Sequence, residues 1–210
     1  MGKEIKLDTN EEREACAAQA MQDEESLELL AEWISGSSRA KRQKAASTIA
    51  IISNTDASVL LPYVDDISSG LSRSEAQTRW EVLHTLDMMG KAGQRYSEDV
   101  IAAAEDALYD ENNGIVRQAA FRLFCGYGGA STENSEEVWP QIDEAIQCYH
   151  GNPEFPNMLV YLVEFAEGNI SLETSAALAQ RMKFDAENAS GVLRMRSEQI
   201  LEAHKKRAES

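Results

Sequence analysis

Apolar residues recur along this chain at the three- and four-residue spacing of helices rather than in the alternation of strands. The stretch "GIVRQAAFRLF", residues 114–124, reads as a core helix in which one charged residue, Arg117, follows Val116. Three other stretches carry arginine at the same second position: "KRQKAASTIAIIS" (Arg42), "TRWEVLHTLDMMG" (Arg79) and "LRMRSEQILEAHK" (Arg194). The arginine therefore marks a repeated helix, in which its stem packs on apolar neighbours and its guanidinium meets a carboxylate.

The arginines are 37, 38 and 77 residues apart, and the last gap holds one more unit, "PNMLVYLVEFAEG", with Asn157 in the arginine column. A second helical stretch precedes each arginine helix, and Asp56, Ser97, Ser135 and Ser171 are plausible caps for these first helices. The sequence predicts a single domain over 1–210, with an extra helix near 10–21 and five hairpins at 24–54, 56–90, 97–128, 135–168 and 171–207.

The third unit, "ALYDENNGIVRQAAFRLFCGYG", resembles HEAT repeats, whose second helix begins with an acidic turn, then Val-Arg and small residues. The resemblance covers roughly residues 24–207 and implies an all-α, right-handed α-solenoid of about five HEAT-like hairpins. In that family the acid of the turn often pairs with the arginine. The resemblance therefore suggests Asp110 with Arg117, Glu187 with Arg194, and Asp65 or Asp66 with Arg79. Ser35, Ser72 and His150 stand at the acid's offset in the other units, so we expect no continuous ladder of pairs.

When the second helices are aligned, some positions are apolar in every repeat and should face the core; Val160 is predicted to be one of them. Two other positions, four residues apart, hold polar, aromatic and apolar residues and form one strip on the same helix face. In HEAT-like proteins the second helices line the concave side, so the resemblance implies that this strip is a groove. Trp80 stands out there as a binding anchor, although packing against a neighbouring repeat would also explain it. The predicted binding residues are Gln43, Trp80, His84, Gln118, Arg122 and Met158.

Charge and cysteine content narrow the class of partner. The chain has 20 basic and 36 acidic residues, a net charge of −16, which weighs against nucleic-acid binding. The three cysteines, Cys16, Cys125 and Cys148, show no paired spacing, and reduced thiols in the cytoplasm are expected. No apolar run is long enough to span a membrane.

No catalytic motif occurs, and His84, Cys148 and His150 could form a metal site only by accident of folding. We therefore expect no cofactor and no enzymatic activity, but an interaction or scaffolding module that binds a protein or peptide along the second-helix groove, with no nucleic acid and no membrane. The alternative from another class is an enzyme similar to HEAT-like DNA glycosylases, for which Trp80, Asp87 and Arg122 are the nearest candidates. A lyase or modification partner of HEAT-like fold is a third possibility.

Overall fold

The computed structural model describes residues 5–209, and within that range it contains helices and turns but no strand. The all-helical prediction is confirmed. The chain divides into two compact units, residues 1–116 and 117–210. The sequence predicts one domain over 1–210; that the two units form one continuous repeat domain stays a prediction.

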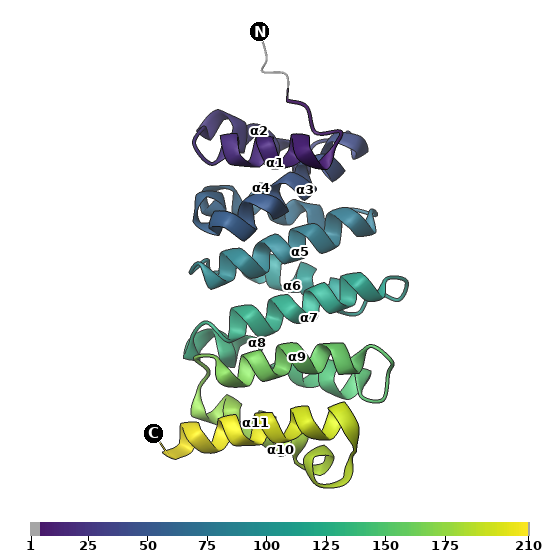
Figure 1. The fold of residues 1–210 in the computed structure, drawn as a ribbon, viewed down its shortest axis with the longest axis vertical. Helices are drawn as coiled ribbons and strands as arrows, with labels where there is room; N and C mark the ends of the chain where they lie inside the picture. The colour runs from purple at the N-terminus through teal and green to yellow at the C-terminus, as the bar shows by residue number, and fades with distance from the viewer. Residues whose placement is uncertain (1–4, 210) are drawn as a thin grey trace. The chain divides into compact units, whose positions relative to one another are not determined.

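In the N-terminal unit the first and second helices of successive hairpins alternate along the chain. Its helices are α1 (Asn10–Ala20), α2 (Glu24–Ser35), α3 (Arg39–Asp56), α4 (Val64–Ser68), α5 (Ala76–Lys91) and α6 (Glu98–Leu108). The extra helix predicted at 10–21 is α1; it begins at a capping box in which Thr9 and Glu12 bond each other's backbone, and it packs against α3. The second helices α3 and α5 pack against each other, and Figure 1 shows α5 in front of α6.

The first half of the second hairpin is irregular. Two 3₁₀ segments, Ala57–Tyr63 and Ser69–Ser72, flank the five-residue α4, and Pro62 lies inside the first of them. Proline has no backbone N–H to continue a helical ladder, which fits this broken path. The turn also needs a glycine: a Cβ on Gly70 would lie 2.8 Å from Cγ2 of Val82 and 3.0 Å from Cγ2 of Ile34.

The C-terminal unit continues with regular hairpins. Its helices are α7 (Gly114–Gly128), which starts three residues before the boundary, α8 (Thr132–Tyr149), α9 (Phe155–Glu167), α10 (Leu172–Asn188) and α11 (Gly191–Glu209). In Figure 1, α9 and α11 face the viewer and α8 and α10 lie behind them.

Most of the predicted helix caps are present. The hydroxyls of Ser97 and Ser171 accept backbone N–H bonds at the starts of α6 and α10, and Asp56 caps the first 3₁₀ segment. The cap predicted at Ser135 is wrong. Helix α8 starts earlier, at Thr132, and its cap is Ser131, whose Oγ accepts from the Asn134 N–H at 3.1 Å, while Ser135 is fully buried inside the helix.

The burial pattern of the second helices gives their true register. Buried positions in α3 recur 37 residues later in α5, and those of α5 recur 38 residues later in α7. The step from α7 to α9 is again 38, not the 40 that an Asn157 in the arginine column requires. Met158 therefore matches the buried Ala120 and is 0% exposed, whereas Val160 matches Arg122 and is 36% exposed. The sequence placed Met158 on the surface and Val160 in the core, and both placements are wrong.

The arginines bind acids at the start of the next second helix. Arg42 donates to Glu75, the residue that caps α5, at 2.6 Å, and both side chains are buried. Arg79 pairs with Asp110, just before α7. In the C-terminal unit Arg117 donates from Nε to Oε2 of Glu154, at the start of α9, at 3.1 Å. Each pair joins the acid that precedes one second helix to the arginine of the second helix before it in the chain.

Two of the expected pairs are thereby corrected. Arg79 binds Asp110 rather than Asp65 or Asp66, because the acid comes from the following turn and not from its own. Arg194 bonds Glu198 one turn further along α11, at 2.8 Å, instead of Glu187. Three successive arginines are paired in the same way, but α9 has no arginine in this column and Arg194 pairs within its own helix, so the pairs do not run through all five hairpins. A bond between Asp110 and Arg117 would join the two units and stays a prediction.

Candidate functional site

One face of the N-terminal unit gathers polar and aromatic side chains of two second helices. Residues that are three or four positions apart share a face of a helix. We call the set the α3–α5 surface; it consists of Gln43, Ser47 and Asn54 on α3 and Gln77, Trp80, Glu81 and His84 on α5. The predicted residues Gln43, Trp80 and His84 are all partly exposed there.

Hydrogen bonds between side chains cross the seam between these two helices. The Ser47 hydroxyl donates to Oε1 of Glu81 at 2.7 Å, and the amide of Gln77 reaches the Ser47 oxygen at 3.2 Å. About two turns further along α3, Asn54 Oδ1 lies 2.8 Å from Nε2 of His84. These bonds restrict the side chains of the two helices to one arrangement.

Glu81 is the unusual member of the α3–α5 surface. It is only 6% exposed, and its Oε2 has no hydrogen-bond partner among the described residues. Burial raises the pKa of the Glu81 carboxyl, an effect that the bonds from Ser47 and Gln77 and the charge of Arg13 on α1 only partly offset. A buried acid without a cationic partner is costly to ionise.

Sequence reasoning missed Glu81. Its column in the repeat alignment holds Lys44 and Ala119, and a lone glutamate between them gives no hint of burial. The available signal was its spacing: Glu81 stands four residues after Gln77 and three before His84, on the face already chosen for His84 and Trp80.

In the C-terminal unit, Gln118 and Arg122 are partly exposed on α7, as predicted. The guanidinium carbon of Arg122 lies 5.9 Å from the centre of the Tyr161 ring on α9, within the range of a cation–π contact. Met158 lies on α9 but points into the core, so it cannot contact a partner. A hollow of about 460 Å³ on the face of α11 is lined by residues that include Glu167, Met195, Glu198 and Glu202.

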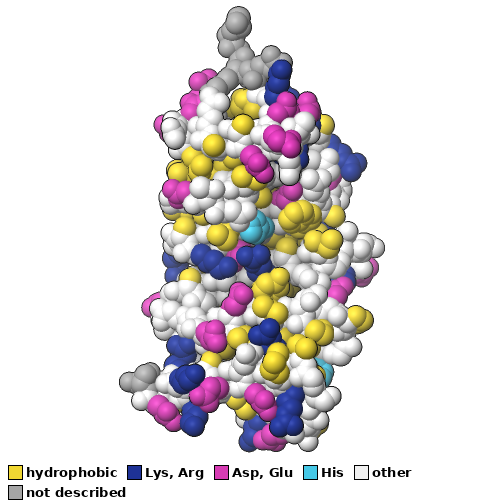
Figure 2. Space-filling view, viewed as in Figure 1, with side chains coloured by type: hydrophobic (Ala, Val, Ile, Leu, Met, Phe, Trp, Pro, Cys, Tyr) yellow, Lys and Arg dark blue, Asp and Glu magenta, His cyan; other side chains and the backbone are white. Residues whose placement is uncertain are grey.

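Figure 2 shows the side chains by type, viewed from the same side as Figure 1. Hydrophobic side chains gather there between basic and acidic ones, rather than under one unbroken field of acids.

Other side chains of types that can act in catalysis are buried or bonded within the protein. Asp87, the acid of the glycosylase alternative, is 0% exposed and accepts a bond from Lys91 at 3.0 Å. Ser175 Oγ lies 3.0 Å from Nδ1 of His204, but the serine is 2% exposed, which leaves its hydroxyl no open side for a substrate. Across residues 5–209 no group of three or more His, Cys, Asp or Glu side chains could hold a metal ion.

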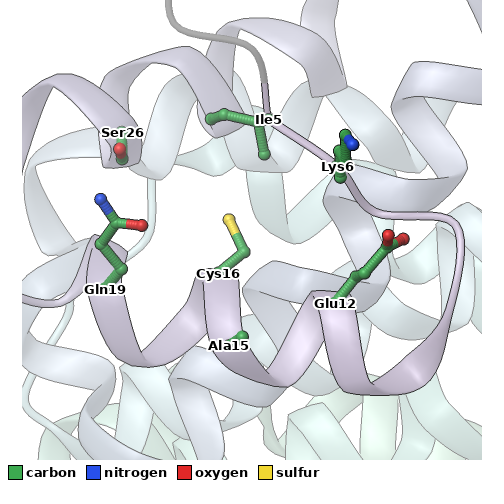
Figure 3. Close-up of a pocket in the computed structure, with 7 residues that line it drawn as sticks. All are labelled: Ile5, Lys6, Glu12, Ala15, Cys16, Gln19 and Ser26. Atoms are coloured by element: carbon green, nitrogen blue, oxygen red, sulfur yellow. The ribbon is translucent and has the colours of Figure 1, made fainter.

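A separate hollow of about 250 Å³ lies beside α1. Figure 3 shows Cys16 and Ile5 pointing into it, with Glu12 and Lys6 at one end and Gln19 and Ser26 at the other. It is formed by the segment before α1 together with α1 and α2, so it is distinct from the α3–α5 surface.

The fold has close counterparts among solved structures. A designed armadillo repeat protein in complex with the peptide (KR)4 is 13% identical, with a TM-score of 0.69 over 94% of this chain and 87% of that chain. The chain has an armadillo-like helical-repeat fold. An engineered protein (14% identity, TM-score 0.66, 96% and 95% coverage) and a computationally designed armadillo repeat protein for modular peptide recognition (12%, 0.63, 92% of each chain) are also similar.

The likeness concerns the fold alone. No family model and no curated protein matches the sequence, and the assignment to HEAT repeats in particular stays a prediction. None of the helices in residues 5–209 combines the length and apolar character that crossing a membrane requires.

Proposed function

We propose that this chain binds a peptide, or an extended segment of a protein partner, along the faces of its second helices, and foremost on the α3–α5 surface. The observation that carries the proposal is the arrangement of that surface: a partly exposed tryptophan beside polar groups already fixed by hydrogen bonds between two helices. Helical repeats present extended faces of this kind to their partners.

Trp80 is the proposed anchor. Tryptophan is enriched among the few residues that dominate binding energy, because it buries a large rigid surface at a low entropy cost. Gln43 and His84 would supply hydrogen bonds on either side of it. In the C-terminal unit Gln118 and Arg122 are proposed to take the corresponding roles, and Met158 has none because it is buried.

The comparisons add support of a coarser kind. Two of the similar structures are designed repeat proteins that their descriptions connect with peptides, one of them in complex with (KR)4. The enzyme alternative finds less support, since its nearest acid, Asp87, is fully buried. A catalytic acid must reach its substrate.

The test is selection of binders from a displayed library of random dodecapeptides, followed by calorimetric titration of the selected peptides with the full chain. We expect Trp80→Ala to weaken binding at least tenfold. Trp33→Ala is the matched control: Trp33 is also partly exposed in the N-terminal unit, but it lies on α2, beneath Lys41 at 4.8 Å. Far-ultraviolet circular dichroism checks that both variants fold.

The outcomes separate the surface from the function. Loss of affinity in Trp80→Ala alone supports the α3–α5 surface. Equal loss in both variants, or loss in Trp33→Ala alone, overturns that surface. A library that gives no binder overturns peptide binding itself.

A further inference from the structure

Glu81 differs from the other buried acids of the N-terminal unit in what surrounds it. Glu75 and Asp110 each meet an arginine of the same unit; the bond from Arg42 lowers the pKa of Glu75, and at Asp110 burial raises the pKa but the bonds from Arg79 and from the backbone outweigh it. Glu81 meets only neutral donors, the Ser47 hydroxyl and the Gln77 amide, and both act on Oε1. Its second oxygen is buried without a hydrogen-bond partner among the described residues, as is the second oxygen of Glu75, so the two acids differ in the charge of their donors.

The neutral contacts leave room for a stronger donor. Gln77 is exposed, and its amide nitrogen lies 3.4 Å from Oε1 of Glu81, at the long limit of a hydrogen bond. An incoming group can displace this amide with little loss, while the shorter bond from Ser47 keeps the carboxyl in position. What the site lacks is a charged donor, which forms a shorter and stronger bond to a carboxylate than an amide does.

The nearby cations of the chain are committed elsewhere. Arg13 donates to the Leu7 carbonyl and to Oδ1 of Asn10, and Lys44 pairs with Asp8. Residues 1–116 hold 11 basic and 22 acidic side chains, a net charge of −11, against −5 for residues 117–210. A positively charged ligand is therefore attracted to this unit in particular.

We propose that Glu81 is the subsite for a lysine or arginine side chain of the bound peptide, which displaces the Gln77 amide and takes the buried carboxyl as its counter-ion. The inference rests on the proposed function and names the chemistry of its partner. Trp80, on the same face of α5, offers an apolar and aromatic surface to the aliphatic stem of such a side chain.

Binding of this kind is linked to the release of a proton. Because burial raises the pKa of Glu81, the free protein keeps that carboxyl protonated up to a higher pH than an ordinary glutamate. The cation favours the ionised form, so the proton leaves to the buffer as the ion pair forms. Affinity should rise with pH through the free carboxyl's pKa and then level off. The charge of Arg13 on α1 lowers the pKa of Glu81 and so opposes the effect of burial, and it does so in the free protein as well as in the complex.

The experiment uses the full chain and two synthetic probes: an octapeptide of alternating lysine and arginine, and its neutral counterpart with glutamine and citrulline in their places. Titration calorimetry is run at a series of pH values upward from the ordinary glutamate value of 4.5, in two buffers of different ionisation enthalpy at each pH, and gives affinity and proton release together. We expect the charged probe to bind, Glu81→Gln to weaken it at least tenfold and to abolish proton release, and the neutral probe to bind weakly to both.

Glu28→Gln is the matched control, since it removes the same charge from an exposed position on α2. We expect it to change affinity less than twofold and to keep proton release. Equal effects of the two variants would mean that overall charge, and not this subsite, attracts the probe, and they would overturn the inference. If library peptides bind through Trp80 but the charged probe does not bind, the inference fails and the proposed function stands. If neither binds, both fail.

Discussion

Glu75 and Glu81 lie six residues apart in the chain, at the start of α5 and in its second turn, and each is 6% exposed. Their surroundings differ completely. Glu75 accepts a charged bond from the buried Arg42, whose second nitrogen also bonds the Gly36 carbonyl. Glu81 accepts only neutral bonds. The pKa of Glu75 is lowered and that of Glu81 is raised.

Equal burial thus has opposite consequences, and the difference lies in whether the chain supplies the counter-charge. An acid with its own arginine joins two repeats, and its charge is already neutralised within the chain. An ionised acid without an arginine destabilises the free protein, and it can form a favourable ion pair in a complex with a cation. The ion pairs at the helix starts and the α3–α5 surface are therefore expected to respond differently to mutation.

The largest expected effect is on stability at Glu75. Arg42→Ala leaves that carboxylate buried without a counter-ion and should lower the free energy of unfolding by about 3–5 kcal/mol. Arg39→Ala is the control, because Arg39 reaches the same carboxylate only at 3.8 Å and its side chain is 73% exposed. We expect that variant to cost less than about 1 kcal/mol. Urea denaturation measures both, and similar losses would show that burial of the pair does not matter.

The arginine column is the feature that sequence reasoning used best. A charged residue repeated at a fixed place in apolar helices indicates one structural role repeated, and three of the four arginines do share a setting. The partner of each arginine was harder to predict, because an acid in a turn can serve the helix before it or after it. Arg194 differs because no further repeat follows α11 within the described residues to supply an acid.

The errors at Met158 and Val160 have a physical origin. Phe155 takes the place of the arginine in α9, so the strongest marker of the register is missing there, and a shift of two residues turns a helix face by about 200°. Glu81 was missed for another reason: its burial depends on how α3 and α5 pack, and no pattern within α5 alone reveals that. Trp80 and His84 are partly exposed on α5, as their columns predicted, and their role in binding stays a prediction.

A smaller effect is expected where the same kind of pair is less buried. The side chains of Arg117 and Glu154 are 18% and 26% exposed, against 8% and 4% for Arg42 and Glu75. Water can solvate Glu154 once the arginine is removed, so Arg117→Ala should cost about 1 kcal/mol. The same urea titration checks it. A loss as large as that of Arg42→Ala would show that the two pairs are equivalent despite their exposure.

The smallest effect, and the one that separates the two acids most sharply, is expected from Glu81→Gln. Glutamine keeps an acceptor for Ser47 and removes a charge that burial disfavours, so at pH 7 the variant should be as stable as the parent chain or slightly more stable. Glu75→Gln is the comparison, and it should be less stable than the parent at that pH because it loses the charged bond to Arg42.

The dependence of these differences on pH should have opposite signs. Glu75 has a folded-state pKa below the ordinary value of 4.5, so its contribution to stability is present above that pH and is lost as the pH falls through the folded-state value. Glu81 has a raised value, so its contribution is present below pH 4.5 and is lost as the pH rises through the folded-state pKa. Thermal melts of the parent and both variants between pH 3.5 and 8, a range chosen around the ordinary value, measure both trends. The comparison fails if Glu81→Gln becomes less stable relative to the parent chain as the pH rises, which is the trend expected of Glu75→Gln. Glu81 would then be a structural acid like Glu75.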